Sequence, residues 1–442
     1  MNEKELAKLA SWIANVGLKG TTESALIEGF CSRARAAGLP LERMIAFIDT
    51  LHPVHEGRAF RWERDKPVVT VTEYGRTNEG EAAQRWQSSP HYRMLQTGES
   101  LMRIPLTEDA KREFVLLPSW WGEGSATEYV AMVNRFSADG VIGEMDCFYT
   151  GFVTEREGGF SDDEVAALER LTPHLGLAVK AAALARIAET LVETYLGRDA
   201  GRRVLQGRIA RGVADRIKAV LWFSDLRSYT RITDSAPPEQ IIPLLNDYAE
   251  AVVSAIHENS GDVLKLIGDG VLAIFPAQER ARACAAALAA ASQARAAVSA
   301  LSARRQSEGL PATEMYLGLH LGVVFYGNIG SKDRLDFTVV GPAVNEVARI
   351  AAMCRSVEQP ILMSSAFVAS VAEERRRFAS VGRYALRGVG EPQELYTLDP
   401  GAPQAVAIQY EVPSFAGFSP DREMNTELAP VAPDSPAPSR QK

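Results

Sequence analysis

The sequence predicts two α+β domains joined by a helix, and three observations support this prediction. The chain has 442 residues, enough for two or three domains with cores of their own. Short apolar runs and patterns of helical period occur together in residues 1–176 and again in residues 215–399. Between them lies a helical stretch whose leucines recur every seven residues.

Composition and charge exclude several classes of protein. Apolar residues make up 46% of the chain and charged residues 24%, as in ordinary globular proteins. The net charge of -8 argues against a general nucleic-acid binder, which needs a basic surface. The four cysteines lack metal-ligand spacing, which favours buried, reduced thiols: Cys31, Cys147, Cys284 and Cys354.

No segment has the pattern of a signal peptide or a membrane span. The N-terminal residues lack the apolar core of a signal peptide. The Ala-rich segment 281–301 is interrupted by Arg282 and Arg295, and it is typical of a helix packed on a sheet. We therefore expect a cytoplasmic protein.

The first domain is expected to begin with two helices and to end with a third. Leu6, Leu9 and Ile13 would share one face of the first helix. The closing helix follows Ser161, which forms a capping box with Glu164; Pro173 could kink this helix. Strand-like runs lie between these helices at residues 44–50, 59–62, 68–74, 114–117, 129–136 and 141–149.

Residues 158–175 resemble the last helix of a GAF-type sensor domain. They read Gly-Gly-Phe-Ser-Asp-Asp-Glu-Val-Ala-Ala-Leu-Glu-Arg-Leu-Thr-Pro-His-Leu. The order helix, strands, loop, strands, helix also agrees with that family. The resemblance implies a sensor over residues 1–176 that binds a small molecule; an α+β domain without a ligand is the alternative.

Residues 177–214 are expected to form a helical linker. Two apolar rows recur every seven residues: Leu177, Leu184 and Leu191, and Ala181, Ala188 and Tyr195. These rows predict a short coiled-coil seam between two chains, and a helix packed on its own domain is the alternative. Four glycines then interrupt the pattern: Gly197, Gly201, Gly207 and Gly212.

Residues 215–399 are expected to form the second domain, in a βαββαβ-like order with additions. This order places helices on one face of a mainly antiparallel sheet. The predicted strands are 217–225, 262–267, 271–276, 314–323 and 335–340, and the predicted helices are 238–258, 278–304 and 343–354. Residues 400–442 are rich in Pro, Ala and Ser and are expected to be disordered.

Two aspartates lie where apolar strands of the second domain end. Asp225 precedes a turn that is expected to open a helix, and Asp269 lies in Gly-Asp-Gly at the tip of a hairpin. Each alone has an ordinary explanation, as a helix cap or as a turn residue. Together they favour a metal site, because two close carboxylates are costly unless a cation neutralises them.

Three further polar residues could contact a ligand. Lys265 lies four residues before Asp269 in an apolar strand, so we expect both on one face. It either reaches solvent at the sheet edge or donates a hydrogen bond to a ligand. Asn345 and Arg349 share one face of a helix that begins at Pro342 and could hold a ribose and a phosphate; a solvated helix face is the alternative.

Taken together, these segments resemble the class III nucleotidyl cyclase catalytic domain over residues 217–398. The motifs are Phe-Ser-Asp225, Lys265-x-x-Gly-Asp269-Gly and Thr338-x-x-Gly-x-x-Val-Asn345-x-x-x-Arg349. The resemblance implies a ferredoxin-like βαββαβ fold. It also implies an enzyme that forms a 3′,5′-cyclic nucleotide and pyrophosphate from a nucleoside triphosphate.

The resemblance assigns a role to each position. Asp225 and Asp269 would bind two divalent cations, Mg²⁺ or Mn²⁺, in each active site. The ribose 3′-hydroxyl would attack the α-phosphate in line, and pyrophosphate would leave. Asn345 would orient the ribose, and Arg349 would stabilise charge that develops on the α-phosphate. Arg387 lies near the position where the family binds the terminal phosphates.

Two positions indicate the base. The family reads the purine at the positions of Lys265 and Thr338, where guanylate-specific members carry Glu and Cys. We therefore expect an adenylate cyclase that takes ATP, from a Thr-bearing subgroup in which some members respond to bicarbonate; a guanylate cyclase is the alternative. Ser228-Tyr229 replaces the Gly-Phe that is common in the family, and the serine is acceptable there if its φ is negative.

In the family, each active site is divided between two chains. The aspartates come from one protomer, and the lysine, threonine, asparagine and arginine come from the other. This chain carries both sets, so the resemblance implies a homodimer with two equivalent sites, regulated by the sensor domain. A non-catalytic nucleotide-binding or dimerisation module is the alternative, and the complete set of site residues weighs against it. A diguanylate cyclase on a related fold is a further alternative, but the sequence has no Gly-Gly-Asp/Glu-Glu-Phe run.

Overall fold

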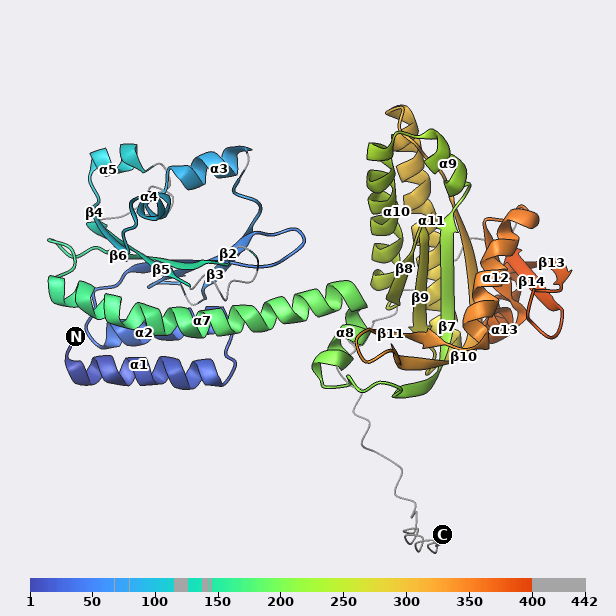
Figure 1. Ribbon diagram of the computed structural model, residues 1–442, viewed down its shortest axis with the longest axis horizontal. Coiled ribbons are helices and arrows are strands. Elements are labelled where there is room, and N and C mark those ends of the chain that lie inside the picture. The colour runs from blue at the N-terminus through green and yellow to red at the C-terminus, as the bar shows by residue number, and fades with distance from the viewer. Residues whose placement is uncertain (67, 79, 115–125, 137–142, 144, 400–442) are drawn as a thin grey trace, which may run out of the picture.

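The computed structural model describes residues 1–66, 68–78, 80–114, 126–136, 143 and 145–399 (Figure 1). Within these residues the chain forms a six-stranded sheet in its first half and an eight-stranded sheet in its second half. A long helix, α7 (Asp162–Leu196), connects the two halves. The predicted tail lies outside the described residues.

The first sheet is antiparallel and has helices on both faces. Its order is β3 (Thr70–Tyr74), β2 (Gly57–Glu63), β1 (Arg43–Asp49), β6 (Cys147–Thr154), β5 (Glu128–Arg135) and β4 (Leu101–Pro105). Helices α1 (Glu3–Leu18), α2 (Glu23–Ala36) and α7 cover one face, and the shorter α3 (Gly80–Gln87), α4 (Pro90–Thr97) and α5 (Glu108–Glu113) lie over the other (Figure 1). Leu6, Leu9 and Ile13 are buried in the core, as the helical pattern predicts.

The predicted strand 114–117 is wrong at its first residue, since Phe114 caps the C-terminus of α5; residues 115–117 lie outside the described part. The predicted strand 141–149 begins only at Cys147, and residues 141, 142 and 144 are outside that part as well. Strand β4 and helices α3 to α5 have no counterpart in the prediction. They are five to eight residues long, too short for a period to be distinguished.

Helix α7 begins with the predicted capping box and continues through Pro173. Ser161 N donates to a Glu164 carboxylate oxygen (2.8 Å), and Glu164 N donates to Ser161 Oγ (3.4 Å). Burial of Leu171 and Leu175 on either side of Pro173 stabilises the helix against the loss of one backbone hydrogen bond. Leu177 and Tyr195 are 70% and 80% exposed, so this chain leaves part of the predicted seam uncovered.

The linker contains a helix, α8 (Arg198–Leu205), which corrects the view of its glycines as simple breaks. Gly201 is buried inside α8, where a Cβ would come within 2.9 Å of the Glu193 backbone. Gly197 has a φ of +90°, and a Cβ there would lie 2.5 Å from the Val263 carbonyl oxygen. The glycines therefore let the linker fold back onto itself and onto the second domain.

The second sheet contains the predicted βαββαβ core. Strands β10 (Met315–Gly330), β7 (Ala214–Leu226), β9 (Gly270–Pro276) and β8 (Asp262–Ile267) are neighbours in that order. Helices α10 (Pro238–Glu258) and α11 (Arg280–Ser307) pack on one face (Figure 1). The sheet is extended by β12 (Ile361–Ser364), β14 (Gln393–Leu398) and β13 (Phe378–Tyr384), and β11 (Leu335–Val340) pairs with the far end of β10.

The expectation that the helices share one face is wrong for α12 (Pro342–Ser356). This helix packs on the face opposite α10 and α11, where Ala343 and Val347 join the core beneath β7 and β10. Gly318 makes the contact possible, because a Cβ there would lie 2.7 Å from the Ala351 nitrogen. A strand whose residues alternate between two buried faces accepts a helix on each.

Helix α11 is the one helix of the described residues that is long and apolar enough to cross a membrane by composition. It packs on the sheet with fully buried Cys284, Ala287 and Ala291, as the Ala-rich pattern predicts. Core helices of this composition pass the same test. The four cysteines are free and buried, as expected.

Candidate active site

The fold brings Asp225 and Asp269 together. Asp225 lies near the end of β7, which pairs with β9 through Ser224 and Val271. Asp269 lies in the turn between β8 and β9, and its Oδ2 accepts a hydrogen bond from Leu226 N (3.1 Å). The turn is thereby fixed beside the strand end. Because Asp269 belongs to the turn, the expectation that strand alternation places it on one face with Lys265 does not apply.

The Asp225 carboxylate is suited to a cation. Burial, together with the nearby charge of Asp269, raises its pKa to about 6, while Arg355 opposes the shift. Asp225 Oδ1 is buried and has no hydrogen-bond partner among the described residues. A carboxylate that is costly to ionise and has an unused acceptor atom gains most from a bound cation.

The donor set narrows the type of cation. No group of three His, Cys, Asp or Glu side chains that could hold a metal occurs within the described ranges. Two carboxylates without further protein ligands suit Mg²⁺ or Mn²⁺, since Mg²⁺ keeps several waters and shares substrate phosphate oxygens. The residues present therefore fit a cation whose coordination shell is completed by water and by substrate oxygens.

A buried polar cluster, formed by Trp222, Ser224 and Tyr248, lies beside Asp225 at the end of β7. Ser224 Oγ accepts hydrogen bonds from Trp222 Nε1 and Tyr248 Oη, both at 3.0 Å. These bonds fix the end of β7 against α10. Sequence reasoning missed this cluster, although a serine in an apolar strand, next to a candidate ligand, is a signal of it.

Ser228 has a positive φ, although the serine was expected to be acceptable at this position only with a negative φ. It precedes α9 (Tyr229–Ser235) with φ 58° and ψ 29°, and its side chain does not cap the helix. The turn that follows Asp225 therefore has the left-handed conformation that glycine adopts without strain.

Ser228→Gly is expected to raise the free energy of unfolding by about 0.5–1 kcal/mol, because glycine relieves the left-handed strain. Chemical denaturation of both proteins measures the difference. Ser235→Gly, at the helical end of α9, is the matched control and should lower the free energy of unfolding instead. Equal effects at both positions would show that Ser228 is not strained.

Lys265 and Thr338 lie in one neighbourhood. Lys265 Nζ donates a hydrogen bond to Asp336 Oδ2 of β11. Thr338 follows Asp336 by two residues on β11 and so shares its face. Phe337 and Val339, which alternate with them, are buried in the core beneath. No pattern in the sequence predicts that Asp336 pairs with Lys265.

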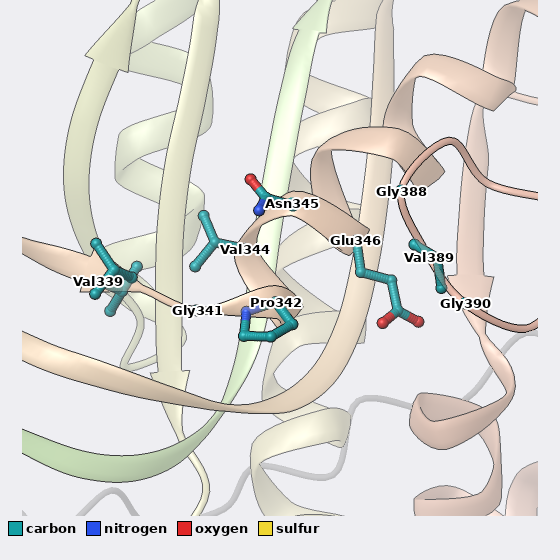
Figure 2. A pocket seen from close by; sticks show the side chains of 10 residues that line it. Val339, Gly341, Pro342, Val344, Asn345, Glu346, Gly388, Val389 and Gly390 are labelled. Atoms are coloured by element: carbon teal, nitrogen blue, oxygen red, sulfur yellow. The ribbon is translucent and has the colours of Figure 1, made fainter.

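Asn345 and Arg349 are both exposed on α12. Asn345 lines a pocket of about 590 Å³ together with Glu346 and the turn Gly388–Gly390 (Figure 2). Arg387 is exposed in the same turn, one residue before the pocket wall. Asn345 thus lines the pocket, whereas Arg387 adjoins it only through the neighbouring Gly388.

The two predicted sets remain separate in one chain. Thr338 pairs with Gly327, and Gly327 pairs with Ala214 at the end of β7 remote from Asp225. Within the part of the chain that the structure describes, no hydrogen bond or ion pair links the two aspartates to Lys265, Thr338, Asn345 or Arg349.

The second half of the chain is similar in sequence to known proteins. Residues 214–400 match the family described as the adenylate and guanylate cyclase catalytic domain. The chain is 33% identical over 210 residues to an uncharacterized protein of Mycobacterium tuberculosis, covering 46% of this chain and 36% of that protein. It is 31% identical over 157 residues to an adenylate cyclase of Anabaena cylindrica, covering 36% and 31%. The chain thus spans about a third of the length of these relatives.

Among solved structures, the adenylyl cyclase CyaB from P. aeruginosa is similar, with 23% identity and a TM-score of 0.39. The match covers 43% of this chain and 97% of that one.

Proposed function

We propose that the chain is an adenylate cyclase, on the premise that residues 214–400 match the adenylate and guanylate cyclase catalytic domain. It would convert ATP into 3′,5′-cyclic AMP and pyrophosphate. The observation that carries the proposal is the buried, unpartnered Oδ1 of Asp225 beside Asp269. Lysine and threonine at the two base-reading positions favour ATP, and the relatives from Anabaena cylindrica and Rhizobium meliloti bear the name adenylate cyclase.

Each residue has a task in the proposed reaction. Asp225 and Asp269 hold Mg²⁺ or Mn²⁺, which when bound supplies Lewis-acid chemistry at the ribose hydroxyl and the phosphates. Lys265 donates to a purine ring nitrogen, and Thr338 accepts from the exocyclic amine. Asn345 orients the ribose for in-line attack on the α-phosphate.

Two arginines complete the site. Arg349 neutralises charge that develops on the α-phosphate, and Arg387 holds the terminal phosphates. Arg387 stands beside the pocket that Asn345 lines, which supports its assignment to the same nucleotide.

The active form in this proposal is a homodimer. Phe325 and Val340 are cross-strand neighbours on β10 and β11, and both side chains are exposed together with Val323. Exposed apolar side chains on a hairpin favour burial against another surface, and a second copy would supply the missing half of each site.

Regulation by the N-terminal domain is part of the proposal, and α8 would connect that domain to the catalytic sheet. The buried carboxylate of Asp262 accepts hydrogen bonds from Arg198 N (3.2 Å) and Asp199 N (3.5 Å) at the start of α8. Asp262 begins β8, the strand that carries Lys265. A shift of α7 and α8 would therefore act on the base-reading strand.

We propose a cytoplasmic location for this ATP-dependent enzyme.

The direct test is a cyclase assay on the purified full chain. With Mn²⁺ and ATP we expect cyclic AMP and pyrophosphate in equal amounts, and much less product with GTP. Product from GTP alone would favour a guanylate cyclase. ATP binding by calorimetry without product would favour the non-catalytic module.

A further inference from the structure

We infer that Asp336 positions Lys265 and thereby contributes to the choice of purine base, an inference that rests on the proposed function. Asp336 Oδ2 accepts a hydrogen bond from Lys265 Nζ, although 71 residues separate the two in sequence. Both side chains are half-exposed, at 46% and 40%, on strands whose neighbouring residues are largely apolar. The pair therefore lies at the surface where a nucleotide would approach Lys265.

The backbone beneath Asp336 is held in place. Phe337 is buried and meets the ring of Tyr326 edge to face, with 4.9 Å between the ring centroids. Val339 is buried in the same core. Because Asp336 and Thr338 alternate with these anchored residues, they present their side chains together on the other face of β11. Strand β11 thus carries Thr338, one proposed base-reading residue, and also Asp336, the partner of the other base-reading residue, Lys265.

The chemistry of the pair suits a positioning role. A lysine ammonium has three N–H donors, so a hydrogen bond to Asp336 leaves two for a purine. Its stem has four flexible carbons, and fixing the ammonium before the nucleotide arrives lowers the entropy that binding must overcome. The Asp336 carboxylate only accepts hydrogen bonds. It therefore favours a base that presents an amine and disfavours a base that presents a carbonyl oxygen.

A purely structural role fits less well. Ion pairs between partly exposed side chains contribute little to stability. Loss of the Asp336 charge should therefore leave the fold intact and alter how Lys265 meets the base.

The test compares Asp336→Asn with the wild type for ATP and for GTP. We expect the ratio of kcat/KM for ATP over GTP to fall roughly tenfold, mainly through a higher KM for ATP. Asp336→Glu should recover part of the ratio. Asp333→Asn, an exposed aspartate in the same hairpin, is the matched control and should leave the ratio unchanged. In a Lys265→Gln background, Asp336→Asn should add little, because it acts through Lys265.

Three results would overturn the inference. One is an unchanged KM and base ratio in Asp336→Asn. A second is a full, additive effect of that substitution in the Lys265→Gln background. The third is a lower melting temperature with a lower kcat but an unchanged base ratio. If the wild type forms no cyclic nucleotide, the proposed function fails by itself; calorimetric affinities for ATP and GTP, in wild type and Asp336→Asn, then decide the inference.

Discussion

Asp225→Asn is expected to reduce cyclase activity roughly a thousandfold while leaving the protein folded. Asparagine keeps the shape of the side chain but lacks the charge that holds a divalent cation. Steady-state rates with ATP and Mn²⁺ measure the loss. Asp234→Asn, on the exposed surface of α9, is the matched control and should keep wild-type activity.

Although Asp225→Asn should lose activity, its stability without metal should not fall. The pKa of Asp225 is raised from its model-compound value of 3.8 to about 6, so the unfolded chain releases this proton at lower pH than the folded one. The folded state therefore loses stability as pH rises through this window, and asparagine removes that loss. Without metal at pH 8, Asp225→Asn should be at least as stable as the wild type. Mn²⁺ should raise the melting temperature of the wild type only.

A mixing experiment extends this prediction to the divided site. Asp225→Asn and Arg349→Ala should each be inactive alone. Coexpression in equal amounts should recover about a quarter of wild-type activity, because half of the dimers are mixed and each of these has one intact site of two. No recovery, with mixed dimers shown to form, would place the whole site within one chain and contradict the divided site.

The second large effect concerns the base. Lys265→Glu combined with Thr338→Cys is expected to shift the ratio of kcat/KM from ATP toward GTP by roughly a thousandfold, since polar groups that read a base penalise the wrong one strongly. Activity with both nucleotides measures the shift. Lys332→Glu makes the same charge change at an exposed position and should leave the ratio unaltered.

The contact between Lys265 and Asp336 refines this design. Glutamate at position 265 would face the carboxylate of Asp336, so the double variant should be slow with both nucleotides. Adding Asp336→Asn removes this repulsion and should restore the rate with GTP. An unshifted base ratio in the triple variant would show that Lys265 and Thr338 do not read the base.

Elements with strong local signals could be predicted closely. The helix Pro238–Glu258 and the strands Asp262–Ile267 and Leu335–Val340 have the expected bounds. A proline that opens a helix, a hairpin turn and a Gly-Pro boundary define them locally. The strands β12 to β14 were not predicted: β12 is buried but only four residues long, and β13 and β14 are partly exposed without a clear alternation, so none of them shows a distinct period.

The sequence by itself determined the family-like motifs, the order of the catalytic core and the candidate site residues, because each rests on residue type and local spacing. Only the tertiary structure decided that α12 covers the second face of the sheet and that Ser228 is left-handed. It also decided that Asp225 keeps an unpartnered buried oxygen and that Lys265 meets Asp336. These features depend on contacts between segments far apart in the chain, which local periodicity and spacing do not encode.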